Sequence, residues 1–154
     1  MARDVIGRFP ESRMTNFQLG RPRHREVDSP IATTYELSML RIYAYEKCST
    51  CRDALKFARE RGWKTEVIPI RDQPPTKAEL KKMLGLLNGE LRRLFNTSGL
   101  DYKAMGMKDK LPGMSEADAI ELLSKNGNLV KRPFVLGARG GTVGFKPGEW
   151  DKLQ

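Results

Sequence analysis

The alternation of apolar and polar residues becomes regular at residue 40, where it predicts a strand, a helix and a second strand in succession. Residues 40–45 alternate as a strand, residues 49–61 follow a helical pattern that Gly62 closes, and residues 65–70 form the second strand. Pro69 has no backbone N–H, so the second strand is expected at a sheet edge. This order implies two parallel strands joined by a right-handed crossover.

The middle of the chain is predicted to be helical. Thr76 and Glu79 form a capping-box signature ahead of an apolar helix. A short helix is expected over residues 89–95, and residues 96–99 end it. Ser115 then begins a further helix, which stops before the next predicted strand.

The last part of the chain returns to strands. Residues 134–137 and 142–145 are expected to form a hairpin around a turn at Arg139-Gly140-Gly141, and a last helical turn begins near Pro147. The whole order is β-α-β, a helical block and β-β-α. It predicts an α/β fold of the thioredoxin-like class, with a mixed sheet and helices inserted in its middle.

Residues 1–38 differ from the rest because they show no sustained strand or helix periodicity. Residues 20–25 form an extended basic stretch. We expect either a disordered tail or a start codon assigned too far upstream, since Met39 stands just before the first strand. Residues 39–154 are then the single folded domain.

Composition and charge describe a globular protein of 154 residues, 39% apolar and 31% charged. No apolar stretch reaches the roughly 18 residues of a membrane span, and no secretory pattern opens the chain. We expect a cytoplasmic protein, since a reducing compartment also suits its cysteine usage. Of the net charge of +9, residues 1–38 carry +1, with six Lys/Arg against five Asp/Glu. This surplus either attracts anionic partners or is a solvated basic surface.

The candidate chemistry centres on the two cysteines, Cys48 and Cys51, at a predicted strand-to-helix junction. A Cys-x-x-Cys pair in this place is typical of a thiol redox site. The free N–H groups of the helix start, with Lys47 and Arg52 nearby, are expected to favour the Cys48 thiolate. Cys51 lies one turn further in, on the same helix face, and is the expected resolving thiol.

The pair also allows two other interpretations. Both cysteines could be inert core residues, although burial alone gives no reason for them to flank a helix start. A zinc site would need further ligands, and the only histidine, His24, lies in the irregular segment. We therefore expect no bound metal or cofactor, and no Cys–His dyad that activates the nucleophile.

A second candidate feature is the Arg132-Pro133 pair, just before the predicted hairpin. In a thioredoxin-like arrangement a cis-proline at this place faces the redox pair, so we expect a cis bond at Pro133. Arg132 would then direct its guanidinium at the thiolate or at a bound oxyanion. The alternative is a proline that merely begins a strand beside a surface arginine.

From residue 39 to residue 154 the sequence resembles the arsenate reductase (ArsC)/Spx family. The matching stretches are Tyr45-Glu46-Lys47-Cys48-Ser49-Thr50-Cys51-Arg52, Pro74-Pro75-Thr76 with Glu79-Leu80, Leu94-Phe95-Asn96-Thr97-Ser98-Gly99, and Leu129-Val130-Lys131-Arg132-Pro133. The resemblance implies a thioredoxin-like fold with an inserted helical region. It also implies that Cys48 is the catalytic cysteine and Arg132 the arginine before the cis-proline.

Two departures from the family pattern bear on the substrate. Glutaredoxin-linked arsenate reductases bind the oxyanion with three arginines, but here Asn96 and Lys146 take two of those positions and only Arg132 is present. Those enzymes also have a serine at the position of Cys51. In Cys51 and Asn96 the chain is more similar to the Spx/MgsR branch, whose members bind RNA polymerase and use Cys-x-x-Cys as a redox switch.

The resemblance thus implies a thiol-dependent oxidoreductase with Cys48 as nucleophile, Cys51 as resolving thiol, and a small oxyanion such as arsenate, or a thiol compound, as substrate. The expected oxyanion-binding residues are Arg132, Asn96, Lys146 and Arg52. Glutathione, glutaredoxin or thioredoxin would be the external reductant. The alternative is a redox-sensing regulator that binds RNA polymerase through a Cys48–Cys51 switch. We expect a monomer with no direct DNA binding and no membrane contact.

Overall fold

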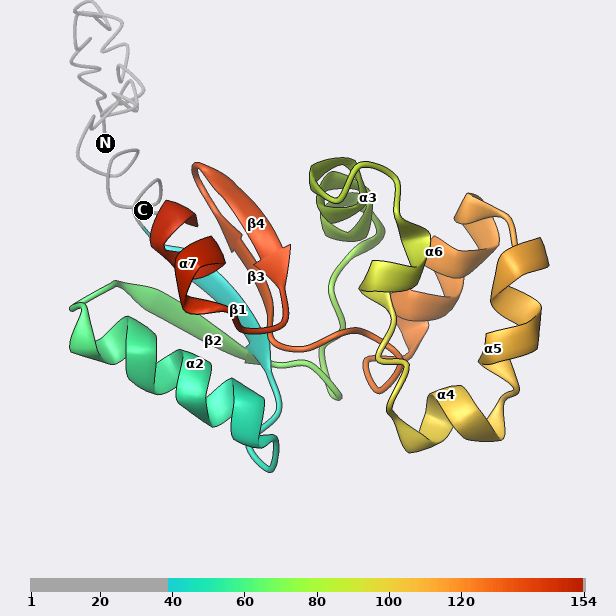
Figure 1. The fold of residues 1–154 in the computed structure, drawn as a ribbon, viewed down its shortest axis with the longest axis horizontal. Helices are drawn as coiled ribbons and strands as arrows, with labels where there is room; N and C mark the ends of the chain where they lie inside the picture. Colours follow the sequence, from blue (N-terminus) through green and yellow to red (C-terminus); the bar gives the residue numbers. More distant parts are fainter. Residues whose placement is uncertain (1–38, 154) are drawn as a thin grey trace, which may run out of the picture.

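The computed structural model describes residues 39–153, whose centre is a four-stranded sheet (Figure 1). The tail predicted for residues 1–38 lies outside the described residues. In space the order of the strands is β2 (Thr65–Pro69), β1 (Leu40–Ala44), β3 (Phe134–Gly137) and β4 (Gly140–Val143). β1 pairs in parallel with β2 and antiparallel with β3, and β3 pairs antiparallel with β4. The predicted mixed sheet is confirmed, and β2, which carries Pro69, lies at its edge as expected.

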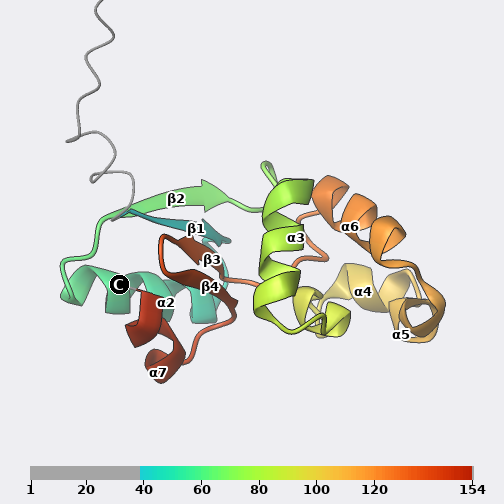
Figure 2. The same ribbon diagram turned by 90° about the horizontal axis from the view of Figure 1, so that it is seen from above.

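Helices surround this sheet in two groups. The helices are α2 (Ser49–Glu60), α3 (Lys77–Leu86), α4 (Leu100–Ala104), α5 (Met107–Lys110), α6 (Glu116–Lys125) and α7 (Pro147–Trp150), with short 3-10 turns η1 (Leu91–Leu94), η2 (Leu111–Gly113) and η3 (Asp151–Leu153). Figure 2 shows α2 and α7 together on one side of the sheet, while α3 to α6 form a separate helical block beside it.

Alternate residues of β1 belong to two different hydrophobic clusters, because successive strand residues point to opposite faces. Leu40, Ile42 and Ala44 pack with α2 and α7, whereas Tyr43 packs with the helical block. Both faces of β1 are therefore covered. The loop that follows it, residues 45–48, emerges where the two clusters meet.

The helix starts in the block follow the sequence signals. The Thr76 hydroxyl accepts the N–H of Glu79 at 3.3 Å, and the Glu79 carboxylate accepts the N–H of Thr76 at 2.9 Å, so the predicted capping box is confirmed. Ser115 likewise caps α6 by accepting the N–H of Asp118 at 3.1 Å. Each cap satisfies a backbone donor that has no partner within its own helix.

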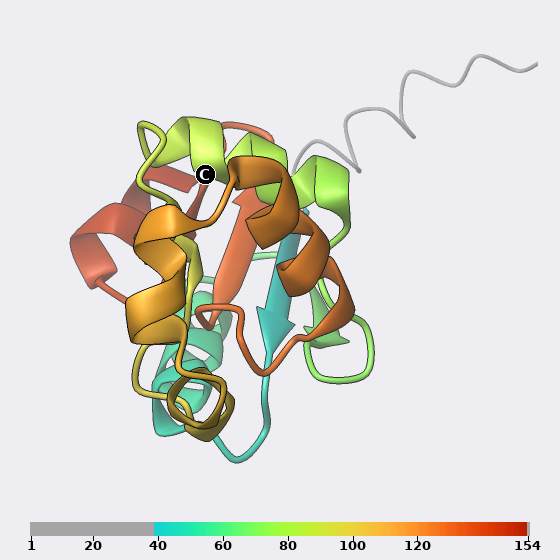
Figure 3. The ribbon, with the colours of Figure 1, turned by 90° about the vertical axis from the view of Figure 1, so that its right-hand side faces the viewer.

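Two helices of the block were not anticipated. α4 and α5 are short and meet at Gly106, whose φ of +63° is a conformation that glycine adopts without steric cost. The helix expected over residues 89–95 is the 3-10 turn η1. In Figure 3, α4, α5 and α6 lie in front of the sheet, and together with α3 they bury one continuous cluster of side chains.

The hairpin prediction was wrong about which residues turn. Gly140 and Gly141 belong to β4 and pair with Gly137 and Leu136, which leaves residues 138–139 as the turn. A Cβ at Gly141 would lie 2.6 Å from the carbonyl oxygen of Val135 and 2.9 Å from the end of the Met83 side chain. Glycine is therefore needed here because the backbone of β3 approaches too closely for a side chain, not for a tight turn.

Candidate active site

Cys48 occupies the N-cap of α2, between the end of β1 and the first helical turn. Its backbone is extended (φ −95°, ψ 117°), its N–H donates to the carbonyl of Tyr45 at 3.0 Å, and its carbonyl accepts the N–H of Arg52 at 3.1 Å. The first turn of a helix has N–H groups without intrahelical acceptors, and these point toward the N-cap side chain. The Cys48 sulfur is thus placed where a negative charge is stabilised.

The electrostatic surroundings of Cys48 favour its thiolate. Burial on its own would raise the pKa of Cys48, but hydrogen bonds from Cys51, the charge of Arg132 and the backbone N–H of Thr50 outweigh it and lower that pKa below its ordinary value. Cys48 is partly exposed, so the thiolate can be reached from solvent. These are the properties of a reactive cysteine.

Cys51 has the opposite environment. Its side chain is 1% exposed and packs in the cluster that includes Ala54 and Ala58 of the same helix. Burial, together with the hydrogen bond and the charge of Cys48, raises the pKa of Cys51 to about 12. The pair therefore favours deprotonation of Cys48 and keeps Cys51 as a thiol at neutral pH.

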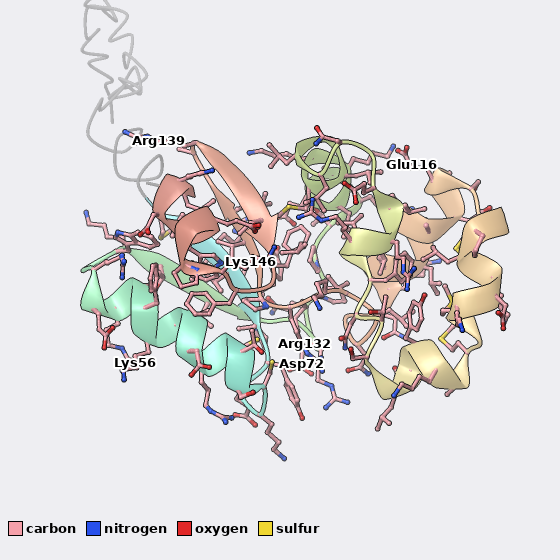
Figure 4. All side chains as sticks on the ribbon, viewed as in Figure 1. Lys56, Asp72, Glu116, Arg132, Arg139 and Lys146 are labelled. Carbon is pink, nitrogen blue, oxygen red and sulfur yellow. The ribbon has the colours of Figure 1, made fainter. Side chains whose placement is uncertain are left out.

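Arg132 is the cation that acts on both sulfurs. Its charge lowers the pKa of Cys48 and opposes the rise at Cys51. The peptide bond between Arg132 and Pro133 is cis. Within residues 39–153 the Nη1 atom of Arg132 is buried and has no hydrogen-bond partner. Figure 4 shows Arg132 between the sheet and the helical block. A buried donor of this kind can accommodate an anion at little further cost.

A basic cavity of about 520 Å³ lies beside Arg132. Its wall includes Thr50 of the first turn of α2 and the cis-proline loop. The basic residues that line it are Arg92, Arg93, Lys131, Arg132 and Lys146, and the acidic one is Glu90. The excess of positive charge suits an anionic ligand. Arg92 and Arg93 were missed in the sequence, where they precede the Asn96 motif without any pattern that marks them as site residues.

The four expected oxyanion-binding residues have different environments. Arg132 and Lys146 both line the basic cavity, although Lys146 Nζ lies 3.1 Å from a carboxylate oxygen of Glu149. Asn96 donates from its side chain to the carbonyl of Asn128 at 3.3 Å. Arg52 donates to the carbonyl of Glu46 at 3.2 Å, a contact that stabilises the loop before Cys48. The structure thus brings Arg132 and Lys146 together and directs Asn96 and Arg52 to backbone carbonyls.

Residues 39–153 contain neither a metal-binding cluster nor a membrane-spanning helix. Within that range no three His, Cys, Asp or Glu side chains are grouped closely enough to hold a metal ion. No helix in the same range has both the length and the apolar character to cross a membrane.

Comparison with known proteins identifies the family. A sequence model of the ArsC family matches residues 43–153. The chain is 42% identical over 113 residues to the uncharacterized protein YusI of Bacillus subtilis, which covers 73% of this chain and 96% of YusI. It is 27% identical over 99 residues to an arsenate reductase of Rhizobium meliloti, covering 64% and 69% of the two chains. It is 25% identical over 114 residues to the regulatory protein MgsR of Bacillus subtilis, covering 74% and 89%.

Solved structures agree with these matches. A crystal structure of an ArsC-family related protein from Bacteroides fragilis superimposes with a TM-score of 0.71 at 43% identity, over 75% of this chain and 97% of that one. The predicted thioredoxin-like α/β fold is thereby confirmed. The matched region contains both cysteines, the cis-proline loop and the helical block between them. On this evidence of sequence and fold, the chain belongs to the ArsC family.

Proposed function

We propose that this chain is a thiol-dependent oxidoreductase in which Cys48 attacks an anionic, oxidised substrate and Cys51 resolves the adduct. The observation that carries the proposal is the contrast within the pair. A partly exposed cysteine with a lowered pKa stands one helical turn from a buried cysteine with a raised pKa, and the charge of Arg132, whose Nη1 has no hydrogen-bond partner within residues 39–153, acts on both.

With arsenate as substrate the reaction balances as follows. The Cys48 thiolate bonds to As(V), and one arsenate oxygen leaves as water after protonation. The Cys51 sulfur then attacks the Cys48 sulfur and loses its proton. The Cys48–arsenic bond breaks, and its electron pair stays on arsenic. Two thiols become one disulfide, and As(V) becomes As(III) and leaves as arsenite.

The raised pKa of Cys51 fits this sequence of steps. Part of the rise comes from the hydrogen bond and negative charge of Cys48. Once Cys48 has formed its bond to the substrate, that charge is gone, so Cys51 becomes easier to deprotonate when it is needed. The resting pair thus favours the charged form of the nucleophile and keeps the resolving thiol protonated.

Anion binding is the role proposed for the basic cavity. Arg132 offers a buried donor that has no partner among residues 39–153, Lys131 adds positive charge from the same loop, and Arg92 adds it from η1. Lys146 contributes less, since Glu149 neutralises it in part. The positions of Arg92 and Lys131 let them replace the charge that Asn96 does not supply.

An external thiol must return the disulfide to two thiols, because the residues of the site supply no further electrons. Glutathione, glutaredoxin or thioredoxin is the reductant class we propose, acting on a monomer in the cytoplasm, where such thiols are kept reduced. The reductant is consumed in each turnover, so no bound cofactor is needed.

A regulator is the second candidate function, and the likeness to MgsR favours it. In that case the same Cys48–Cys51 disulfide would change a surface that binds RNA polymerase. Both functions use the same Cys48–Cys51 disulfide. In the enzyme an external thiol reduces it after each turnover, whereas in the regulator it changes the surface that binds RNA polymerase.

A single-turnover experiment with the reduced full-length chain and arsenate separates the two functions. The oxidoreductase proposal predicts one arsenite for each Cys48–Cys51 disulfide, and neither product with Cys48→Ser. Disulfide formation by peroxide but not by arsenate would count against arsenate as the substrate. If such a chain also retained purified RNA polymerase in only one redox state, the regulator would replace the enzyme.

A further inference from the structure

Tyr45 contacts Arg132 and both cysteines of the site, although the reaction proposed above gives it no role. Its carbonyl accepts the N–H of Cys48 at 3.0 Å, and its backbone forms a hydrogen bond that lowers the pKa of Cys51. The centroid of its ring lies 5.0 Å from the guanidinium carbon of Arg132. One residue therefore contacts the backbone of Cys48, the Cys51 thiol and the cation that acts on both sulfurs.

A second guanidinium fixes the ring of Tyr45 from the loop after β2. Nη1 of Arg71 donates to the Tyr45 hydroxyl at 2.9 Å, and its guanidinium carbon lies 4.8 Å from the ring centroid. A hydroxyl held in this way limits the movement of the side chain about its Cα–Cβ bond, so the ring keeps its place. Tyr45 is thus held at both ends: its backbone carbonyl bonds to Cys48, and its hydroxyl bonds to Arg71.

The kind of contact matters for the charge of Arg132. A carboxylate partner would fix a guanidinium but would also neutralise it, whereas the face of an aromatic ring attracts the cation and leaves its net charge intact. In the described part of the chain Arg132 forms no ion pair, and its Nη1 has no hydrogen-bond partner. The ring is therefore the contact that can hold Arg132 while its charge still acts on a bound anion.

We infer that Tyr45 is a positioning residue, whose ring, fixed by Arg71, holds the guanidinium of Arg132 beside Cys48 without neutralising it. The inference rests on the proposed function, because it concerns how the anion-binding arginine of that site is placed.

The test compares the rates at which anionic iodoacetate and neutral iodoacetamide alkylate Cys48 in the full chain. Both reagents need the same thiolate, so the ratio of the two rates at one pH cancels the thiolate fraction and reports the positive charge near the sulfur. We expect Tyr45→Leu to lower this ratio roughly three- to ten-fold, since it removes the cation–π contact. Tyr45→Phe keeps the aromatic face and should lower it by no more than about two-fold.

Two further variants make the comparison specific. Arg71→Met should lower the ratio, because the ring loses the hydrogen bond that fixes it. Arg61→Met is the matched control: it removes a guanidinium 3.4 Å from the ring centroid of Phe57, at the opposite end of α2, and should leave the ratio unchanged. A merely structural role for Tyr45 would not distinguish between an anionic and a neutral reagent.

The outcomes separate this inference from the function on which it rests. Arg132→Met should lower the ratio as much as Tyr45→Leu does, and the double variant should lower it no further. If Arg132→Met lowers the ratio and Tyr45→Leu keeps the wild-type value, the inference fails and the proposed function stands. If Arg132→Met itself has no effect, Arg132 does not act on the anion, and the proposed site must be abandoned as well.

Discussion

Cys48 and Cys51 lie one turn apart on the same helix, yet the pKa of Cys48 is lowered and the pKa of Cys51 is raised to about 12. The difference arises because Cys48 is the N-cap of α2, beside free N–H groups and Arg132, while Cys51 points into the core with 1% of its surface exposed. The order of the two thiols in any reaction is set by this contrast: the first attacks and the second resolves.

Alkylation of the two cysteines should reflect the contrast directly. As pH rises, Cys48 should react with iodoacetamide with a midpoint well below the value of about 8.5 for free cysteine. Cys51 should stay nearly unreactive through neutral pH, since its thiol loses its proton only near pH 12. Peptide mapping of the labelled chain measures both. A Cys48 midpoint at or above the free-cysteine value would contradict the nucleophile role.

Loss of cations from the basic cavity should weaken oxyanion binding. Arg132→Met removes a charge-assisted donor worth roughly 1.5–3 kcal/mol, so the KM for arsenate should rise about 10- to 100-fold. Arg132→Lys should recover only part of the loss, because an ammonium cannot form a planar two-donor contact. Steady-state assays with an external thiol measure the effect.

The control for that comparison is Lys56→Met. Lys56 is exposed on α2 and pairs with Glu60, so its loss changes the net charge by the same amount away from the cavity (Figure 4). An equal rise in KM for Lys56→Met and Arg132→Met would show that overall charge, and not the cavity, governs the affinity.

Restoring the arginines that the family pattern places at two positions should improve arsenate affinity. The double variant Asn96→Arg with Lys146→Arg adds one charge and changes an ammonium into a guanidinium fork. We expect the KM to fall about ten-fold or more. The gain will be reduced by the lost hydrogen bond from Asn96 to the carbonyl of Asn128. No change in KM would mean that the substrate does not approach these two positions.

Glu79 should be a major contributor to stability away from the site. Its carboxylate accepts hydrogen bonds from the N–H and hydroxyl of Thr76, from Tyr43 and from Arg41. Replacing it by Ala leaves the Tyr43 hydroxyl and the helix start without their partner, so the free energy of unfolding should fall by about 2 kcal/mol. Urea denaturation measures this. Glu60→Ala, which removes an exposed carboxylate from α2, should cost far less.

The pH dependence of that stability has a defined sign. Burial would raise the pKa of Glu79, but its hydrogen bonds with Thr76, Arg41 and Tyr43 outweigh burial and lower it. A lowered folded pKa gives stability that is present above the unfolded value of about 4.3 and is lost as pH falls through the folded value. The stability difference between the wild type and Glu79→Gln should therefore shrink below about pH 4. A difference that stayed constant down to pH 2 would exclude this role of the charge.

The sequence predicts those parts of the site that depend on neighbouring residues. Thr76 and Glu79 are three residues apart, and Cys48 and Cys51 share one helical turn, so a local pattern is enough to place each pair. The cavity is different, because Arg92 reaches it from η1 and Lys131 from the cis-proline loop, far from Cys48 in the sequence.

The errors in the fold have the same origin in long-range packing. Gly140 and Gly141 have the composition of a turn, but the folded chain places them in β4, where the backbone carbonyl of Val135, with the end of the Met83 side chain from α3 close behind it, leaves no room for a Cβ at Gly141. The two contacts of the Tyr45 ring could not be predicted either, since Arg71 and Arg132 approach the ring only in the folded chain. Contacts between distant segments decided both cases.

Mild oxidation of the reduced chain with one equivalent of hydrogen peroxide, followed by intact-mass analysis and peptide mapping, tests the redox pair most directly. Because the resolving thiol lies one helical turn from the nucleophile, the account predicts a loss of two hydrogens per chain and a single Cys48–Cys51 linkage. Cys51→Ser should instead carry added oxygen on Cys48 or form a dimer through it. Wild-type protein that mainly gains oxygen, or that dimerises through Cys48, would contradict the account.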